Sequence, residues 1–205
     1  MIKVGIINYG MGNLGSVRRK FDLLGIHSEI TSDYKLIRDF DKIIFPGVGH
    51  FAMGVENLKK LSLWDELNEA VLIRKKPILG ICLGMQLMAK HSEEGDVDGL
   101  GWFDGTVNKF TIEDKLKYKI PHMGWNTLKI CRQHNVLKGI SEEDEFYFVH
   151  SYHFRMNTPD HILAETEYNY SFTSAVVREH IIGFQFHPEK SLETGKKLLR
   201  NFIKL

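Results

Sequence analysis

The sequence has little of what stabilises small secreted domains. Its 205 residues include only two cysteines, Cys82 and Cys131, and no C-x-x-C pair, so neither a disulfide framework nor a structural zinc site is expected. No apolar run approaches the length of a membrane-spanning helix, and the first residues lack the layout of a secretory signal. These absences predict a protein of the reducing cytoplasm, without a membrane partner, in which a free thiol survives.

An excess of charge of either sign is also missing. Lysine and arginine together number 27 and aspartate and glutamate 26, which gives a net charge of +1. We therefore expect no nucleic-acid partner, because such partners are usually matched by a strongly basic surface. The chain contains no repeat, low-complexity stretch or linker, and its length is typical of one folded unit. A single domain over residues 1–205 is expected.

The order of apolar segments predicts an α/β fold. Buried strands are expected at 2–8, 27–31, 41–45 and 77–82, and helices at 14–24, 55–60 and 63–73. This alternation favours a parallel sheet flanked by helices, with ligands outside the carboxyl ends of its strands. Short aromatic and β-branched segments in the second half predict an added antiparallel layer, at 105–112, 125–131, 145–151, 161–166, 173–178 and 181–186. An amphipathic helix is expected at 191–205.

The stretch from Ile78 to Met88 contains the pattern G-x-C-x-G, with Cys82 between Gly80 and Gly84. The pattern is typical of a nucleophile elbow, a sharp turn from a strand into a helix that needs glycines on both sides to avoid clashes with neighbouring chain. At the start of a helix, Cys82 would be favoured as a thiolate, and the N–H of Leu83 would be free to hold an oxyanion. On this pattern alone, a small core cysteine packed between two glycines is an equally good explanation.

A second glycine-rich segment, Pro46–Gly49, also follows an expected strand. Gly47 and Gly49 flank Val48, so the backbone there can turn its N–H groups inward to bind an anion. A plain glycine turn explains the segment equally well. Because Val48 and Cys82 both follow strands of one parallel sheet, they should share an edge of it.

A cysteine nucleophile needs a base, and the base needs a group that orients it. His187 is the best placed of ten histidines, because it ends an apolar segment and is followed by Pro188 and Glu189. Side chains at i and i+2 of an extended chain point the same way, so Glu189 would reach the ring of His187 and fix its tautomer. Taken alone, a solvated His-Pro-Glu turn is the simpler interpretation. His150 is the alternative base, although no carboxylate follows two residues later.

Five motifs, in this order, are similar to those of the class I, or triad-type, glutamine amidotransferases, which have a flavodoxin-like fold. They are Asn8–Leu14, Pro46–Gly49, Gly80–Gln86, Pro121–Asn126 and Gly183–Ser191. The resemblance covers essentially the full chain. Within this family, Pro-His-Met-Gly-Trp-Asn at 121–126 and Phe-Val-His-Ser-Tyr at 148–152 resemble the glutaminase subunits of imidazole glycerol phosphate synthases.

The resemblance implies a glutaminase with a Cys-His-Glu triad, which hydrolyses L-glutamine to glutamate and ammonia. Cys82 would attack the side-chain amide carbon of glutamine, His187 would move the protons and Glu189 would orient His187. Backbone N–H groups of Leu83 and of Val48, or its neighbour Gly49, would hold the oxyanion.

The resemblance also implies which residues bind the substrate. Gln86 and Glu94 match positions that hold the amino-acid end of glutamine. The backbone of Ser151 and Tyr152 would line the same pocket, and Gly47 is also expected to bind the substrate. Neither a metal nor a cofactor is expected.

A separate partner is implied as well, because 205 residues include no domain for an ammonia acceptor. The family implies a heterodimer with a cyclase subunit built as a (β/α)8 barrel, which makes imidazole glycerol phosphate and AICAR in histidine biosynthesis. Trp125 and Asn126 would lie toward it. His153, where tyrosine is common in the family, leaves open a paralogous glutaminase for another amidotransfer, such as surface-sugar amination. A thiol peptidase and an inactive binding subunit are further alternatives, both disfavoured by the combination of motifs.

Overall fold

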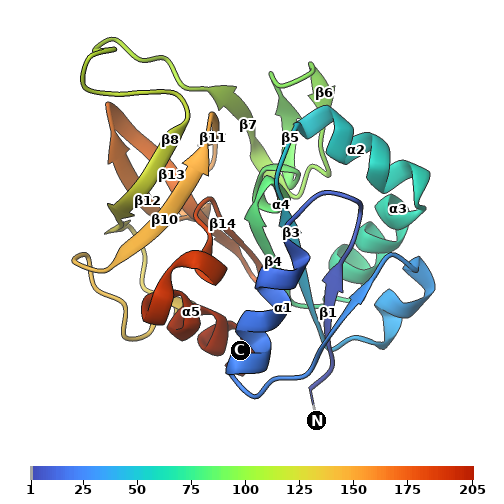
Figure 1. Cartoon of the computed structure of the whole chain (residues 1–205). Helices are drawn as coiled ribbons and strands as arrows, with labels where there is room; N and C mark the ends of the chain where they lie inside the picture. The colour runs from blue at the N-terminus through green and yellow to red at the C-terminus, as the bar shows by residue number, and fades with distance from the viewer. Residues whose placement is uncertain (1) are drawn as a thin grey trace.

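The computed structural model describes residues 2–205, and its central feature is a parallel sheet (Figure 1). Parallel pairings join five strands in the order β2, β1, β3, β4 and β14. Their bounds are β1 Val4–Ile7, β2 Ser28–Thr31, β3 Lys42–Gly47, β4 Ile78–Cys82 and β14 Ile181–Phe184. Strands β1, β3, β4 and β14 are buried throughout, as expected of strands that have helices on both faces.

Helices cover the two faces of this sheet. Helices α1 and α5 pack on one face with Ile44, whereas α2 and α3 pack on the other with Ile43 and Phe45. Successive side chains of a strand point to opposite faces, which explains why the strands form continuous apolar runs. The bounds are α1 Leu14–Leu23, α2 Phe51–Lys60, α3 Leu63–Asn68 with a π turn at Glu69–Ile73, the short α4 Leu83–Gln86, and α5 Leu192–Lys204.

Antiparallel strands extend the sheet beyond β14. The order continues as β13, β11, β7, β5 and β6, with β12 and β9 as a branch from β13, so that twelve strands of the described chain form one sheet. Strands β8 and β10 form a separate two-stranded ribbon. The bounds are β5 Ala89–Ser92, β6 Val97–Asp98, β7 Phe103–Lys109, β8 His122–Thr127, β9 Lys129–Ile130, β10 Glu145–His150, β11 Tyr152–Met156, β12 Ile162–Tyr168 and β13 Tyr170–Arg178. Single 3-10 turns lie at Tyr34–Asp39, Asn135–Leu137, Pro159–His161 and Pro188–Lys190.

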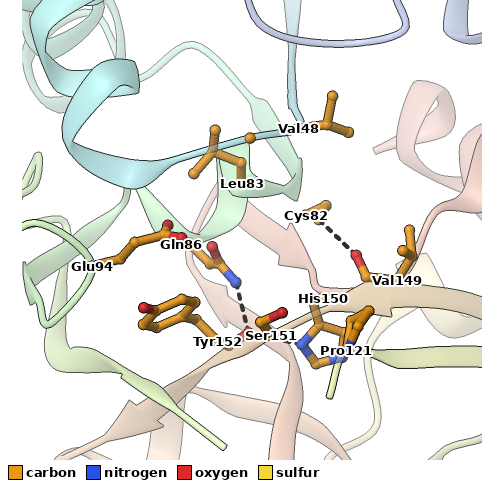
Figure 2. Close-up of a pocket in the computed structure, with 11 residues that line it drawn as sticks. Val48, Cys82, Leu83, Gln86, Glu94, Pro121, Val149, His150, Ser151 and Tyr152 are labelled. Atoms are coloured by element: carbon orange, nitrogen blue, oxygen red, sulfur yellow. Dashed lines mark hydrogen bonds between the residues drawn. The ribbon is translucent and has the colours of Figure 1, made fainter. Parts of the chain in front are cut away.

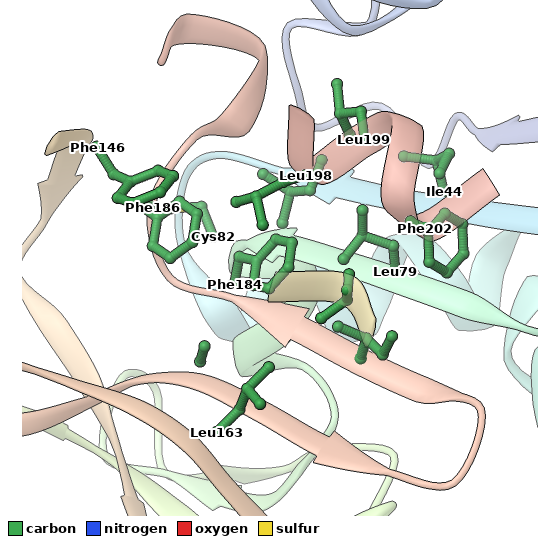
Figure 3. Close-up of a cluster of buried hydrophobic side chains, with 14 of the residues drawn as sticks. Ile44, Leu79, Cys82, Phe146, Leu163, Phe184, Phe186, Leu198, Leu199 and Phe202 are labelled. Carbon is green, nitrogen blue, oxygen red and sulfur yellow. The ribbon is translucent and has the colours of Figure 1, made fainter. Parts of the chain in front are cut away.

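Aromatic rings fill the core next to Cys82 (Figure 3). Phe184 and Phe186 stack with ring centroids 4.9 Å apart, and Phe146 lies 4.5 Å from Phe186. Leucines of α5 and Phe202 pack over β3 and β4 in the same cluster. Strand β4, which ends at Cys82, is therefore held in place by side chains packed on this face of the sheet. The carboxyl end of β4 is left accessible.

The structure confirms the α/β fold with a helix-flanked parallel sheet and antiparallel strands in the second half. Most of those antiparallel strands continue the parallel sheet, and within residues 2–205 it is β8 and β10 that pair apart from it. Strands β5, β6 and β11 were not predicted. The helix expected from residue 55 begins earlier, at Phe51. None of the helices in residues 2–205 has the length and apolar character that crossing a bilayer requires.

Candidate active site

Cys82 lies at the sharp turn between β4 and α4. Its backbone has a φ of 53° and a ψ of −111°, a conformation that residues other than glycine rarely adopt. Gly84 permits this turn, because a Cβ there would overlap the carbonyl oxygen of Phe45. A Cβ on Gly80 would come within 2.8 Å of the backbone nitrogen of Met85. The predicted elbow is present, although α4 has only 4 residues, so its dipole favours a thiolate less than a long helix would.

The ring of His187 is tied to Glu189. Its Nδ1 lies 2.7 Å from Oε1 of Glu189, and both side chains are buried. The contact spans a tight 3-10 turn rather than the extended chain from which it was predicted, because His187 immediately precedes that turn. Two backbone bonds hold His187 in place: its N–H donates to the Tyr147 carbonyl at 2.9 Å, and its carbonyl accepts from the Ser191 hydroxyl at 2.6 Å.

The groups around the imidazole of His187 shift its pKa. Burial, the largest influence, lowers the pKa of His187, but the negative charge of Cys82 and the contact with Glu189 outweigh it and raise the pKa to about 10. His187 is then an imidazolium at neutral pH. Its Nε2 is buried and meets no hydrogen-bond partner within residues 2–205.

A pocket of about 300 Å³ opens over the thiol (Figure 2). In Figure 2, Gln86, Glu94 and Tyr152 gather at one end of the pocket, and Cys82 and Val149 lie at the other. The pocket is lined by Val48, Gly49, Cys82, Leu83, Gln86, Glu94, Pro121, Val149, His150, Ser151 and Tyr152. It has the size and the mixed polar and apolar lining expected of a small-molecule site.

Gln86 has a fixed orientation in this pocket. Its Nε2 donates to the Tyr152 carbonyl and to Oε1 of Gln185, each at 2.9 Å. Both amide hydrogens are thereby used, which leaves Oε1 of Gln86 as an acceptor. Glu94 adds a carboxylate, one oxygen of which accepts from the N–H of Phe51 at the start of α2 at 2.8 Å. The end of the pocket away from the thiol is thus rich in acceptors.

The glycine-rich segment lies directly against the elbow. Gly47 pairs with Cys82 in the parallel register of β3 and β4, so Val48 and Gly49 follow at the same edge of the sheet and line the pocket. Gly49 has a φ of +117°, which favours glycine. A Cβ on Gly47 would overlap the hydroxyl of Tyr9. Gly49 is therefore favoured by its backbone conformation, and Gly47 by its close contact with Tyr9.

Most of the predicted site residues line this one pocket. They are Val48, Gly49, Cys82, Leu83, Gln86, Glu94, Ser151 and Tyr152. Gly47, His187 and Glu189 are outside the lining, next to the elbow. His150, the alternative base, lines the pocket, but its Nδ1 faces the Tyr152 carbonyl at 2.7 Å instead of a carboxylate. Pro121 and Val149 were not predicted as lining residues, because an apolar residue in a sequence does not by itself indicate a binding site.

The fold and this site define the class of protein. Residues 6–205 match the family described as glutamine amidotransferase class-I. The chain belongs to the class I glutamine amidotransferase family.

Similar proteins of known name indicate which group within this family the chain resembles. The chain is 47% identical over 98% of its length to the imidazole glycerol phosphate synthase subunit HisH 2 of Methanococcus maripaludis, and 98% of that protein is covered. It is 43% identical to the subunit HisH 2 of Pseudomonas aeruginosa, again with 98% of each chain covered. HisH 1 of Campylobacter jejuni strain RM1221 is 44% identical, over 98% of this chain and 100% of that protein.

Solved structures support the fold alone, since their identity is low. PurLQS from Thermotoga maritima aligns with a TM-score of 0.73 at 15% identity and covers 99% of this chain and 98% of its own. The glutaminase domain of Trypanosoma brucei CTPS aligns with a TM-score of 0.65 at 18% identity, over 100% of this chain and 94% of its own.

Proposed function

We propose that this chain is the glutaminase subunit of an imidazole glycerol phosphate synthase, which hydrolyses L-glutamine to glutamate and ammonia. One observation carries the proposal. Cys82, whose backbone is strained, lies at one end of a pocket that has hydrogen-bond acceptors at its other end, and the buried pair of His187 and Glu189 lies beside Cys82. The similarity to HisH subunits supports a role of this activity in histidine biosynthesis. They favour this over amidotransfer to a surface sugar, and His153, which kept that alternative open, lies outside the pocket lining.

The thiolate of Cys82 attacks the side-chain amide carbon of glutamine. The imidazolium of His187 then gives its proton to the amide nitrogen, the C–N bond breaks, and ammonia leaves a thioester on the enzyme. His187, now neutral, takes a proton from water, which attacks the thioester and releases glutamate. The thiolate and imidazolium are restored. Glu189 stabilises the charged ring of His187 in each half of the cycle.

Two tetrahedral intermediates form, and each carries an oxyanion. Leu83 is the first residue of α4, so its N–H has no acceptor within the helix. The second donor comes from the glycine-rich segment, at Val48 or Gly49, which lies on the same pocket wall. One such donor contributes about 3 kcal/mol to the stability of the transition state.

The acceptor-rich end of the pocket binds the amino-acid end of glutamine. The free Oε1 of Gln86 and the carboxylate of Glu94 suit the substrate's α-ammonium group. Backbone groups of Ser151 and Tyr152 complete this wall. The substrate amide is thereby directed toward Cys82 at the other end.

A partner subunit receives the ammonia, in this proposal a cyclase with a (β/α)8 barrel that forms a heterodimer with this chain. Exposed apolar side chains near the pocket mouth support it: Met123 is 61% exposed, Trp125 45% and Val48 40%. Such side chains close to a pocket are typical of a surface that another protein covers. The cytoplasmic location and the single domain over residues 1–205 belong to the same proposal.

The test is a glutaminase assay that measures both glutamate and ammonia. Cys82→Ala should abolish hydrolysis and leave the fold intact, because Cys82 lies at the edge of the core. Cys131→Ala is the matched control; this exposed cysteine lies outside the pocket, and its variant should keep full activity. Turnover near the wild-type level in Cys82→Ala would refute the proposed role of the thiol.

A further inference from the structure

Two buried histidines lie directly across from each other in the ribbon of β8 and β10. His122 and His150 are register partners, and Nδ1 of His122 lies 3.1 Å from Nε2 of His150. His150 lines the pocket, whereas His122 is not part of the lining. The proposed mechanism uses neither ring.

The hydrogen bonds of this pair run in one consistent direction. Nδ1 of His150 lies 2.7 Å from the Tyr152 carbonyl, which can only accept, so that nitrogen carries the proton. Nε2 of His150 is then an acceptor, and His122 must donate to it from its own Nδ1. Nε2 of His122 is left as an acceptor facing the amide Nδ2 of Asn126 at 3.4 Å. Protonation of either ring would place two N–H groups against each other.

The surroundings keep both rings neutral and oriented. His122 lies between Tyr168 and Phe148, with ring centroids 4.0 Å and 4.8 Å away and nearly parallel planes. Burial lowers the pKa of His122 to about 4 and is also the main reason that the pKa of His150 is well below its usual value. The pair is therefore a fixed, uncharged unit over the physiological pH range.

The Tyr152 carbonyl connects this pair to the substrate pocket. It accepts from His150 and also from Nε2 of Gln86 at 2.9 Å. Gln86 in turn donates to Gln185, whose Nε2 lies 3.7 Å from the sulfur of Cys82. Each amide in this chain has one orientation that satisfies all its partners, and that of Gln86 requires the Tyr152 carbonyl, which His150 also contacts.

We propose that His122 and His150 are positioning residues for the glutamine pocket and act through the Tyr152 carbonyl on Gln86. His150 fixes the carbonyl, and His122 fixes the tautomer of His150. The main effect falls on the binding of glutamine, because Gln86 lies at the amino-acid end, and a smaller effect reaches the thiol through Gln185. This inference rests on the proposed function, which assigns the pocket to glutamine.

The test uses two pairs of matched variants. Asparagine places its amide near Nδ1 of the histidine that it replaces, so His150→Asn keeps a donor to Tyr152 and His122→Asn keeps a donor to His150. Glutamine places its amide near Nε2, so His150→Gln and His122→Gln lose those donors. Asparagine leaves the larger cavity, and packing alone would therefore make the asparagine variants the more damaged ones.

We expect the opposite order. The KM for glutamine of His150→Gln should be about five- to tenfold above that of His150→Asn, as for the loss of one hydrogen bond, with kcat less affected. The His122 pair should show the same order with a smaller ratio. Equal KM values within each pair, or higher values for the asparagine variants, would overturn the proposal.

A second measurement does not depend on activity or on variants that fold poorly. Imidazole ¹⁵N shifts of the wild-type protein should show His122 and His150 as neutral Nδ1–H tautomers that do not titrate between pH 8 and 6. An Nε2–H tautomer at His150 would overturn the relay even if Cys82→Ala is inactive. Retained hydrolysis in Cys82→Ala, by contrast, would overturn the proposed function and leave the tautomer result standing.

Discussion

At the residue scale, Cys82 combines a strained backbone with a side chain that faces the pocket. Its φ is 53°, and the residue belongs to the core cluster of Phe184 and Phe186 while it also lines the pocket. Strain of this kind persists only where surrounding structure over-determines it. Here Gly84 and the pairing of Gly47 with Cys82 supply that constraint.

The first prediction separates the roles of the two residues next to the thiol. His187→Ala should reduce glutamine turnover more than Glu189→Gln, because the imidazole moves the proton and the carboxylate only stabilises and orients it. We expect a loss of roughly ten- to a hundredfold in kcat for Glu189→Gln, with KM little changed. Steady-state kinetics of both variants would check this. Glu193→Gln, at an exposed position of α5, is the control; a Glu189 variant less active than the His187 variant would reverse the assignment.

A second prediction concerns stability against pH. The pKa of His122 is lowered to about 4 in the folded protein, below its ordinary value of 6.5. Between these values the unfolded chain binds a proton that the folded chain does not, so the free energy of unfolding should fall as the pH drops from 6.5 to 4. His122 should account for roughly 1–3 kcal/mol of that fall. Urea unfolding at several pH values should give a flatter profile for His122→Asn; parallel profiles would contradict it.

Residue types in the sequence predict much of the site, but not all of it. Cysteine, histidine and carboxylate at the right spacings, together with the family motifs around them, are enough to propose Cys82, His187 and Glu189, which lie close together in the structure. The role of His150 could not be predicted in the same way, because its partners, Tyr152 and His122, become partners only through the pairing of β8 with β10 and the reversal after it. A buried chain of hydrogen bonds between residues that are distant in the sequence leaves no local sequence pattern from which it could be predicted.

At the scale of elements, the site is built where β3 and β4 end side by side. Each strand is followed by a glycine-dependent turn, and the two turns lie side by side at one edge of the sheet, where both line the pocket. Strands were predicted best where both faces are buried, since the apolar run is then continuous. Strand β5 follows α4 with no glycine or proline between them to signal the change, and β11 lacks a clean alternation of buried and exposed residues.

A third prediction follows from the close approach of these elements. Gly84→Ala should destabilise the protein by about 3 kcal/mol or more and abolish activity, because the new Cβ would overlap the backbone of β3, which cannot move without moving the sheet. Gly15→Ala is the matched control. Nothing lies within 4 Å of a Cβ there, and α1 should be stabilised by up to about 1 kcal/mol. Thermal unfolding of both variants would test this; a Gly84→Ala protein as stable as the wild type would mean that the elbow tolerates a side chain at this position.

At the scale of the whole molecule, one continuous sheet carries the parallel half, which bears the thiol, and an antiparallel half, whereas Val149 and His150 of the pocket lining come from β10 of the separate ribbon. The exposed Met123 of β8 pairs with Val149, which lines the pocket. A partner that covers the pocket would contact the glycine-rich segment and the β8–β10 ribbon together. Binding there is therefore well placed to influence the oxyanion donors.

The last prediction is that glutamine hydrolysis by the isolated chain is slow and rises by orders of magnitude with the cyclase and its ligand. The Gly47-Val48-Gly49 peptides can reorient at low cost because of their glycines, and one gained donor of about 3 kcal/mol corresponds to roughly a hundredfold in rate. Gly49→Val should depress the stimulated rate more than the basal one, since a Cβ would meet Met11 at 2.6 Å and the φ of +117° is strained for valine.

Trp125→Ala should weaken binding of the cyclase, and Leu23→Ala, which removes an exposed side chain of α1 outside the pocket lining, should not. Titration of each variant with the cyclase, followed by glutaminase kinetics with and without the cyclase ligand, measures both effects. An isolated chain that already hydrolyses glutamine at the rate of the complex would refute the gating, because a donor already in place has nothing to gain from the partner. The chemistry of Cys82 would stand in that case, since it needs the elbow and His187 but not the cyclase.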